Sequence, residues 1–516
     1  MTPSAHGRFT ARGKRDTVHH HSDRHPGRTA LPVAALLAAL AAPTAAAQEA
    51  PSAEEREHAA AWGAHHLCAG LFVVGRDLPR DPATVVARDI ARFPGFRWEE
   101  AFTYQVDSVR RVVTVSAPGI PARSAGYYGD QGCVIHERGS AAVRFTPVDV
   151  PSALPDPATQ PWPTGDAGAH GPLPPGADSA ALTALLDWAM GEAAQNTRAL
   201  VITHGGRIVA ERYAEGFGPH TPQISWSQGK SIAAALTGVL VHQGALSLDQ
   251  PAPVPAWHQD PADPRRAIRI RDLLHMSSGL DFLNLGLADP RSYTNANEHF
   301  RIYFDALDVY DHATRQPMDL PPDSAFRYRN SDPLTLMSVA RRIVEGWGEA
   351  FLTFPQRALF DRIGIRDAVL ETDPYGNFII TGYDFLSAYD WTRFGLLHLW
   401  DGVWPTAPTP CRSAALPLCE GERILPEGWV AFVSAPTPTD PSRSYGGLFW
   451  VNRGGLLPDL PPDAFTAAGF MGQHTVIVPS LDLVIVRLGP SPGQSNQYLN
   501  RVIGGVIEAL GLRPPG

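Results

Sequence analysis

The chain has 516 residues, a formal net charge of -9 and a pI near 6.1, values that exclude the basic surface typical of nucleic-acid-binding proteins. A hydrophobic fraction of 44% is that of a globular protein and is sufficient for a large core. The length fits a leader, an accessory region and one large catalytic domain.

Residues 1–47 have the pattern of an export signal. Basic residues precede the apolar run Leu31–Ala42, and Ala45-Ala46-Ala47 supplies an Ala-x-Ala cleavage site before Gln48. The run is too short to span a bilayer, and no later stretch is long enough, so we expect no transmembrane anchor in the mature chain. The sequence therefore predicts a periplasmic or secreted protein.

The four cysteines, Cys68, Cys133, Cys411 and Cys419, support export. An even number in an exported chain indicates two disulfides, although four buried thiols are the alternative. Proximity favours Cys68–Cys133 and Cys411–Cys419 among the three possible connectivities. The second pair would pin an insertion at residues 400–419.

Residues 48–146 are predicted to form an accessory region without a catalytic pattern. Its His65-His66 pair is interpreted as ordinary helix residues rather than metal ligands. The patterns predict helices over Glu54–Leu71 and Pro82–Phe93 and strands over Phe102–Val106, Arg111–Ser116 and Ala141–Phe145. Residues 147–177 carry nine prolines, which indicates a linker or an extended arm draped over the next domain.

Residues 178–516 are predicted to form the catalytic domain. A helix over Asp178–Ala194 precedes a β-hairpin, Ala199–Thr203 and Arg207–Tyr213, around His204-Gly205-Gly206. This His-Gly-Gly sequence resembles a lipase oxyanion loop, but a turn between two alternating strands explains it sufficiently. Later patterns predict helices over 232–241, 333–346, 385–399 and 500–510 and strands over 448–451, 472–478 and 483–488. The segment Asp281–Pro322 is either a functional lid or contains an element that its pattern does not reveal.

The strongest chemical pattern is Ser227-Gln228-Gly229-Lys230, at the start of a predicted helix. Residues three apart on a helix share a face, so the hydroxyl and the amine can touch. A serine becomes a good nucleophile when a neighbouring base takes its proton, and a neutral lysine can be that base. Free N–H groups at the helix start can also stabilise an oxyanion.

Lys230 is the only lysine after the leader, since the sequence contains two lysines, Lys14 and Lys230, against 41 arginines. Arginine can supply surface charge equally well, but it cannot act as a base because its guanidinium stays protonated. A buried lysine amine can have its pKa lowered to near neutrality. The single lysine therefore indicates a functional residue.

With Tyr328-Arg329-Asn330 and a glycine-bearing terminal strand, these residues resemble the serine β-lactamase/penicillin-binding-protein superfamily. They are most similar to its class C-related branch, which includes carboxylesterases and hydrolases of the 6-aminohexanoate-dimer type. The sequences at 275–282, 393–397 and 472–479 support the resemblance, which covers residues 178–516. It implies an α+β fold: a central antiparallel sheet from the hairpin and the last strands, terminal helices on one face, and a helical lobe carrying Ser227 and Tyr328 on the other.

By the resemblance, Ser227 is the acylated nucleophile, Lys230 its base, and Tyr328 assists proton transfer to and from the serine and the leaving group. A phenol beside an ammonium is easier to ionise, so this pair can relay a proton at neutral pH. Asn330 would orient the lysine or the substrate carbonyl. No metal or organic cofactor is needed.

The third motif departs from the superfamily pattern, Lys-Thr-Gly or His-x-Gly. The matching stretch is predicted to be Phe470-Met471-Gly472-Gln473, in which Gly472 allows close backbone approach. The Gln473 N–H, with that of Ser227, would form the oxyanion hole. The cation that grips a substrate carboxylate is missing, and His474 should face away from the Gln473 side. Neutral esters or amides are therefore favoured over β-lactams and D-alanyl peptides.

Other classes fit less well. Gly489-Pro490-Ser491-Pro492-Gly493 matches the Gly-x-Ser-x-Gly pattern of Ser-His-Asp hydrolases, but Pro492 lacks the N–H that the residue after the nucleophile must donate. No His-Glu-x-x-His or Cys-x-x-Cys pattern indicates a metal site. The remaining alternatives are a β-lactamase, a D-alanyl peptidase, or a catalytically silent penicillin-recognising or cell-wall-binding module. We expect an exported serine hydrolase acting on a small-molecule ester or linear amide.

Overall fold

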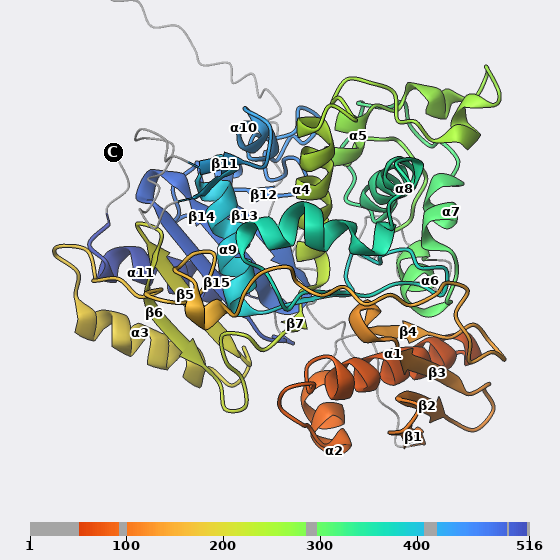
Figure 1. Ribbon diagram of the computed structural model, residues 1–516, viewed down its shortest axis with the longest axis horizontal. Coiled ribbons are helices and arrows are strands. Elements are labelled where there is room, and N and C mark those ends of the chain that lie inside the picture. The colour runs from red at the N-terminus through yellow and green to blue at the C-terminus, as the bar shows by residue number, and fades with distance from the viewer. Residues whose placement is uncertain (1–50, 92–100, 285–296, 407–420, 493–494, 513–516) are drawn as a thin grey trace, which may run out of the picture. The chain divides into compact units, whose positions relative to one another are not determined.

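The computed structural model describes residues 51–91, 101–284, 297–406, 421–492 and 495–512, all within the unit Glu49–Gly516 (Figure 1). The leader and the predicted Cys411–Cys419 disulfide lie outside the described residues. Within them, we find no helix long and apolar enough to cross a membrane.

Six antiparallel strands form the central sheet, in the order β12-β13-β14-β15-β5-β6. Their bounds are β5 Ala199–His204, β6 Arg207–Tyr213, β12 Trp450–Val451, β13 Phe465–Gly469, β14 Gln473–Val478 and β15 Leu483–Leu488. The predicted hairpin is confirmed, because His204 pairs with Arg207 across a two-residue turn. Gly205 and Gly206 have φ of +59° and +72°, which glycine adopts without steric cost. The His-Gly-Gly sequence is therefore a turn.

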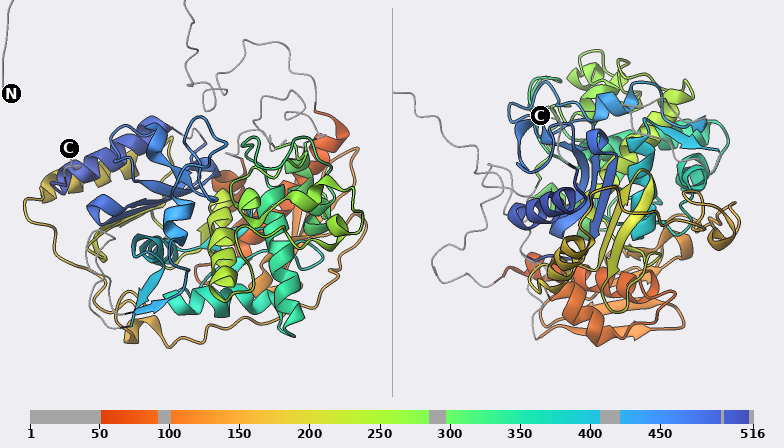
Figure 2. Two further views of the ribbon diagram at one scale, coloured as in Figure 1. Left: turned by 90° about the horizontal axis from the view of Figure 1, so that it is seen from above. Right: turned by 90° about the vertical axis from the view of Figure 1, so that its left-hand side faces the viewer.

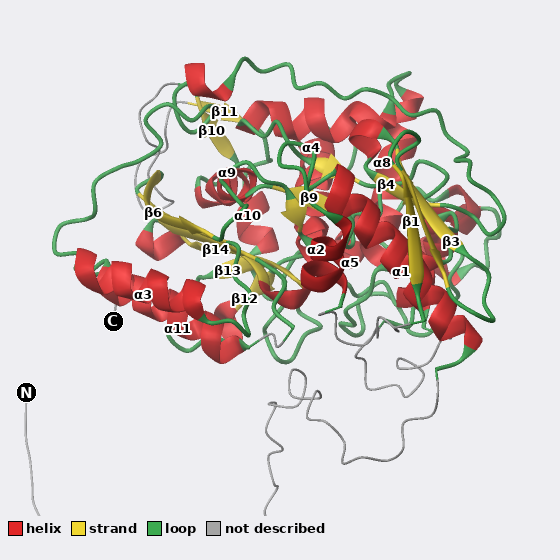
Figure 3. Ribbon diagram, turned by 90° about the horizontal axis from the view of Figure 1, so that it is seen from below, coloured by secondary structure: helices red, strands yellow, loops and turns green. Residues whose placement is uncertain are grey.

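Helices cover both faces of this sheet, as the α+β prediction requires (Figures 1 and 3). Alternation along the strands sends Leu200 and Ile202 to one core, which they share with α3 (Ser179–Gly191) and α11 (Asn496–Ala509). Val201 and Val484 point to the other core, where α9 (Ala388–Leu399) lies. Gly395 allows α9 to approach closely, since a Cβ there would lie 2.6 Å from Val484 Cγ1. Figure 2 shows the same layers from two further directions.

The helical lobe is built around α4, which is buried from Gly229 to Leu240 as expected of a helix that is apolar all round. Two of its helices, α6 and α7, lie in the segment 281–322, so that segment does contain elements that the pattern did not reveal. They are short and are capped by Asn297 and Asp308. The lobe comprises α4 Gly229–His242, α5 Ile270–Leu274, α6 Glu298–Phe304, α7 Val309–Thr314, α8 Ser331–Gly346 and α10 Trp429–Val433.

Two small sheets complete this part of the chain. The first has the order β7-β9-β8, and the second pairs β10 with β11. Their bounds are β7 Gln223–Ile224, β8 Val369–Leu370, β9 Asp384–Leu386, β10 Val403–Pro405 and β11 Gly421–Arg423. The β7–β9 pairing places Ile224 opposite Phe385, directly before the Ser227 turn.

The accessory region folds as a long helix, α1 (Ala53–Phe72), and a short one, α2 (Pro82–Val85), with a four-stranded sheet. The strands are β1 Thr103–Asp107, β2 Val112–Ser116, β3 Arg123–Tyr127 and β4 Cys133–Ile135. The predicted strand over Ala141–Phe145 is wrong, because this segment is irregular. Strand β3 escaped prediction because Arg-Ser-Ala-Gly-Tyr lacks β-branched residues. A disulfide joins Cys68 of α1 to Cys133 of β4, the pairing that proximity favoured.

The proline-rich segment 147–177 is an extended arm rather than a free linker. Trp162 is buried, and its Nε1 donates to the carbonyl of Gly206 at 2.7 Å. The Arg393 guanidinium of α9 donates to the carbonyls of Pro163 and Gly165. The arm is therefore tied to both the hairpin turn and α9.

Candidate active site

The turn before α4 brings Ser227 and Lys230 together. A 3-10 turn, Trp226–Gln228, leads directly into α4, so the two residues lie one turn apart on the same face. The Lys230 amine Nζ donates to Ser227 Oγ at 3.0 Å and to the carbonyl of Thr381 at 3.2 Å. Ser227 is partly exposed, whereas Lys230 is only 1% exposed. A substrate can therefore reach the hydroxyl while the amine stays out of water.

Burial changes the acid–base properties of Lys230. Loss of solvation lowers the pKa of its amine from 10.5 to about 7, and the carboxyl of Asp384 opposes this shift. A large share of the amine is consequently neutral at neutral pH. A neutral amine at 3.0 Å from a serine hydroxyl has the geometry of a general base.

Tyr328 lies on the other side of the same pair. The Lys230 Nζ lies 4.9 Å from the centre of the Tyr328 ring, and the phenol hydrogen-bonds to Ser227. Burial nevertheless raises the pKa of Tyr328 above its ordinary value, and the hydrogen bond to Ser227 offsets only part of this. The expectation that a neighbouring ammonium eases ionisation of the phenol is therefore not met, because the effect of burial dominates. Tyr328 is a protonated phenol that can donate.

The structure places Asn330 in a network that includes residues missed by the sequence analysis. Its Nδ2 lies 3.1 Å from His299 Nδ1 and 3.5 Å from Tyr303 Oη. Tyr303 donates its own proton to the carbonyl of Thr381 at 2.8 Å, the same carbonyl that accepts from Lys230. His299 and Tyr303 stand four apart on α6, but the segment lacked a helical pattern, so neither could be selected. Thr381 acts through its backbone, which leaves no trace in a sequence.

The third motif is arranged differently from its prediction. Gly469, at the end of β13, lies against the turn that carries Ser227, since a Cβ there would lie 2.0 Å from the Ser225 carbonyl oxygen. Gly472, with φ +83°, instead approaches Arg487, whose Nη1 would be 2.8 Å from a Cβ. The Gln473 side chain bonds both the N–H and the carbonyl of Gly489. The close approach that was predicted for Gly472 therefore belongs to Gly469.

The residues of this strand agree with the prediction that a basic residue for binding a substrate carboxylate is missing. Strand β13 reads Phe-Thr-Ala-Ala-Gly and contains no basic residue. His474 is buried, and desolvation, with Arg487 nearby, lowers its pKa to about 3, so it is neutral. Neither β13 nor His474 supplies a positive charge to a substrate carboxylate.

Ser491, in the alternative Gly-x-Ser-x-Gly pattern, is a structural residue. It is 2% exposed, its hydroxyl donates to the carbonyl of Gln195 at 2.5 Å, and Arg487 Nη2 donates to it at 2.7 Å. These two hydrogen bonds hold the Ser491 hydroxyl between the Gln195 carbonyl and the Arg487 guanidinium. The pattern is a coincidence of sequence.

The accessory region packs against the turn that carries Ser227. The Trp62 ring of α1 stacks on Trp226, the residue before Ser227, with ring centres 5.6 Å apart. One turn along α1, His65 stacks on Tyr383 at 3.8 Å and contacts Glu371 at 2.5 Å. The predicted helix residue His65 is thus a buried link between the two parts of the chain.

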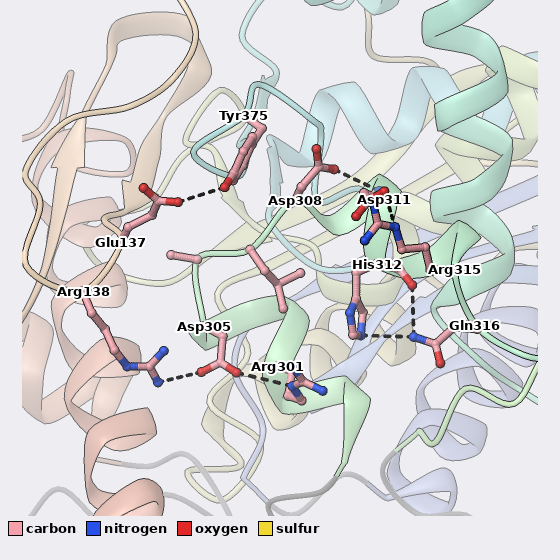
Figure 4. Close-up of a pocket in the computed structure, with 12 residues that line it drawn as sticks. Glu137, Arg138, Arg301, Asp305, Asp308, Asp311, His312, Arg315, Gln316 and Tyr375 are labelled. Carbon is pink, nitrogen blue, oxygen red and sulfur yellow. Dashed lines mark hydrogen bonds and ion pairs between the residues drawn. The ribbon is translucent and has the colours of Figure 1, made fainter. Parts of the chain in front are cut away.

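A cavity of about 520 Å³ lies away from this site, between residues 137–138 of the accessory region and helices α6 and α7 (Figure 4). Its charged residues are largely paired with one another, as Arg138 is with Asp305 at 3.0 Å and Tyr375 with Glu137 at 2.9 Å. Neither Ser227 nor Lys230 lines it. In the described part of the chain no group of three His, Cys, Asp or Glu residues could hold a metal ion.

Part of the sequence is similar to known proteins. Residues 182–505 match the family described as Beta-lactamase. A 6-aminohexanoate-dimer hydrolase of Paenarthrobacter ureafaciens is 24% identical over 334 residues, which are 60% of this chain and 77% of that protein. The accessory region lies outside the family match.

Solved structures also align with the chain. A Bacillus anthracis protein assigned by name to the 6-aminohexanoate-dimer hydrolases is 21% identical, with a TM-score of 0.49, over 70% of this chain and 87% of that one. A penicillin-binding protein homologue from Caulobacter crescentus is 16% identical, with a TM-score of 0.48, over 64% of this chain and 97% of that one.

Proposed function

The chain belongs to the beta-lactamase family of serine hydrolases, and we propose that it cleaves a carboxylic ester or a linear amide through an acyl-enzyme on Ser227. The observation that carries the proposal is the buried amine of Lys230, which lies 3.0 Å from Ser227 Oγ and has a pKa lowered to about 7. A base with a pKa near the working pH is the most efficient general base.

Acylation follows from this geometry. Ser227 Oγ attacks the substrate carbonyl carbon while its proton passes to Lys230 Nζ, and the carbonyl oxygen becomes an oxyanion. Tyr328, as a neutral phenol hydrogen-bonded to Ser227, passes a proton to the departing alkoxide or amine. The proton taken by Lys230 replaces it, so the leaving group departs neutral and the site returns to its starting charge.

Deacylation uses the same groups. Water attacks the acyl carbon, Lys230 accepts its proton, and the bond to Ser227 Oγ breaks as that oxygen is reprotonated. A carboxylic acid is released, and no step in this sequence requires a cofactor.

The oxyanion needs two N–H donors. One is the N–H of Ser227, at the start of the turn that opens α4. We assign the second to the end of β13, at Phe470, because Gly469 lies against Ser225 there. Gln473, whose backbone N–H was predicted for this role, lies across the hairpin and pairs with Gly469 in register.

Substrate preference is proposed from the missing cation. β-Lactams and D-alanyl peptides carry a carboxylate that this superfamily grips with a basic residue, and neither β13 nor the neutral His474 offers one. Neutral esters and amides carry no carboxylate and therefore do not need this basic residue. The leader pattern and the Cys68–Cys133 disulfide support an exported, periplasmic or secreted enzyme.

The test is hydrolysis of short-chain p-nitrophenyl esters and matched p-nitroanilides beside nitrocefin, with wild type and Lys230→Arg. We expect turnover of an ester or anilide that collapses in the variant, with nitrocefin left intact. Nitrocefin turnover would instead establish a β-lactamase, and ester turnover indifferent to Lys230→Arg would remove the lysine base from the mechanism.

Covalent labelling distinguishes the proposed hydrolase from a catalytically silent binding module. A fluorophosphonate probe should modify Ser227 of the wild type and fail with Ser227→Ala. A protein that binds penicillin-like ligands without such labelling would be a recognition module.

A further inference from the structure

We infer that Trp62 of the accessory region is a positioning residue for the nucleophile, and that the face of α1 around it completes the active site. The inference rests on the proposed function, since it concerns the same Ser227 and Lys230. It goes beyond that function by giving the accessory region a part in catalysis. This region lies outside residues 182–505, which match the family.

The residue before the nucleophile has a backbone conformation that its surroundings must hold. Trp226 has a φ of +54°, in the left-handed region that a bulky residue rarely adopts. Such a conformation persists where neighbouring groups fix it. Because Trp226 directly precedes Ser227 in the 3-10 turn, a change in its backbone would move the Ser227 hydroxyl relative to Lys230.

Aromatic rings of α1 hold Trp226 in place. The Trp62 ring lies nearly parallel to it, with centres 5.6 Å apart and planes at 9°. One turn along α1, the His66 ring also stacks on Trp226, at 5.7 Å. Phe470, directly after β13, meets the same ring edge-on at 5.8 Å. Trp226 therefore packs against both the accessory region and the end of the central sheet.

The same face of α1 also contacts α6. His58, Trp62 and His65 stand four and three residues apart on α1, so they share one face, and all three are buried. His58 Nε2 lies 3.1 Å from the carboxylate of Asp305, the residue at which α6 ends. Because α6 carries residues of the active-site network, α1 supports this network as well as the turn.

His65 connects α1 to the segment that holds Lys230. Its ring stacks on Tyr383 at 3.8 Å, and its Nε2 lies 2.5 Å from Glu371 Oε2. Tyr383 stands two residues after Thr381, whose carbonyl accepts from the Lys230 amine at 3.2 Å. Displacement of α1 would therefore loosen this acceptor together with the turn that carries the nucleophile.

The pKa of Lys230 gives a readout of this packing, because loss of solvation is the main cause of its lowered value. The groups that face the amine are the carboxyl of Asp384, the neutral ring of His299 and the protonated phenol of Tyr328. If the packing loosened, water would reach the amine, and both hydration and Asp384 would favour its charged form. The pKa of Lys230 would then rise towards its ordinary value of 10.5.

The test is Trp62→Ala, assayed with the p-nitrophenyl ester that wild type turns over best. Trp62 is 2% exposed and lies behind Trp226, so KM should stay within about threefold of wild type. We expect kcat to fall by about 10²-fold, the effect of a small displacement of the nucleophile. The midpoint of the pH profile of kcat/KM should rise by about one unit. Trp62→Phe keeps an aromatic ring and should recover most of kcat and the wild-type midpoint.

The matched control is Val85→Ala, which weakens the accessory region elsewhere. Val85 is buried against α1 at Gly70, where a Cβ would lie 2.5 Å from Val85 Cγ1, about two turns beyond Trp62. This variant should unfold at a lower urea concentration than wild type. Its kcat, taken per folded molecule, should stay within about twofold and its pH midpoint should not move.

A wild-type kcat and pH midpoint in folded Trp62→Ala would overturn the inference, and so would equal effects of Val85→Ala. If Trp62→Ala did not fold, Trp62→Leu, which fills more of the space but removes the stacked ring, would replace it in the same comparison.

If wild type turned over no ester, the proposed function would fail, and NMR titration of the Lys230 side chain would still test the inference without a substrate. A higher pKa of Lys230 in the Trp62 variant than in wild type would then support it, and equal values would overturn it.

Discussion

Ser227 and Ser491 each lie within hydrogen-bonding distance of a basic side chain, in loops next to the central sheet. Lys230 Nζ is 3.0 Å from Ser227 Oγ, and Arg487 Nη2 is 2.7 Å from Ser491 Oγ. Both bases are buried, so distance and burial do not distinguish the two serines. The two serines differ in the chemistry of the basic side chain beside them.

Burial lowers the pKa of both basic side chains, but by amounts that leave them in different protonation states. It lowers the pKa of Lys230 to about 7 and that of Arg487 only to about 10, so the lysine can be neutral at pH 7 and the guanidinium stays charged. Arg487 donates to carbonyls of Gly472 and Gly489, as a structural cation does. In a chain with 41 arginines, the only lysine after Lys14 lies beside Ser227.

The largest expected effect is that of Ser227→Ala on turnover. Because the acyl-enzyme cannot form, kcat/KM for p-nitrophenyl esters should fall by at least about 10⁴-fold. Far-UV circular dichroism and thermal unfolding should match wild type, since Ser227 is partly exposed. Residual activity within tenfold of wild type would show that another residue is acylated.

Lys230→Arg should come next, because it replaces an amine that can be neutral by a guanidinium that stays protonated and cannot act as a base. Loss of general base catalysis predicts a fall in kcat/KM of about 10²–10⁴-fold. The matched control is Arg487→Lys, which should cost stability but leave kcat/KM within about threefold. If the two substitutions had equal kinetic effects, the contrast between the two bases would not hold.

The pH dependence of kcat/KM tests whether Lys230 acts as a base. Lys230 acts as a base only when neutral, so kcat/KM should be constant above pH about 7 and fall tenfold per unit below it. The raised pKa of Tyr328 predicts no loss up to about pH 9. A profile that stays flat down to pH 5 would rule out this lysine as the base.

Ser491→Ala should have the smallest kinetic effect. It removes the hydroxyl that links Arg487 to the Gln195 carbonyl, so the free energy of unfolding should drop by about 1–3 kcal/mol in urea denaturation. Ester turnover per folded molecule should stay within about twofold. A loss comparable to that of Ser227→Ala would show that Ser491 takes part in catalysis.

Contacts and turns between residues that lie close together in the chain could be predicted from the sequence. The Ser227–Lys230 contact follows from the spacing of three residues on a helix, and the Gly205-Gly206 turn from the two residues that join the strands of a hairpin. Both features are present. The Cys68–Cys133 disulfide is favoured by an even cysteine count and proximity, which leave other pairings open. That the hairpin and the last strands share one antiparallel sheet follows from the family resemblance rather than from local pattern.

Longer-range arrangements could not be predicted. Strand β13 is made of small residues with little alternation, so the motif was placed at Gly472 instead of Gly469. His299 and Tyr303 reach the site from α6, which has only seven residues. The contact of Trp62 with Trp226 joins residues 164 positions apart and depends on tertiary packing alone.

The most direct test of the account is the pKa of Lys230 itself. With lysine labelled at its ε-carbon with ¹³C and Lys14→Arg as background, NMR should show a single lysine side chain. The account predicts that this signal titrates near pH 7, and that the ester rate follows the same curve. A signal that titrates near pH 10 would leave Lys230 protonated at neutral pH and would contradict its role as the base.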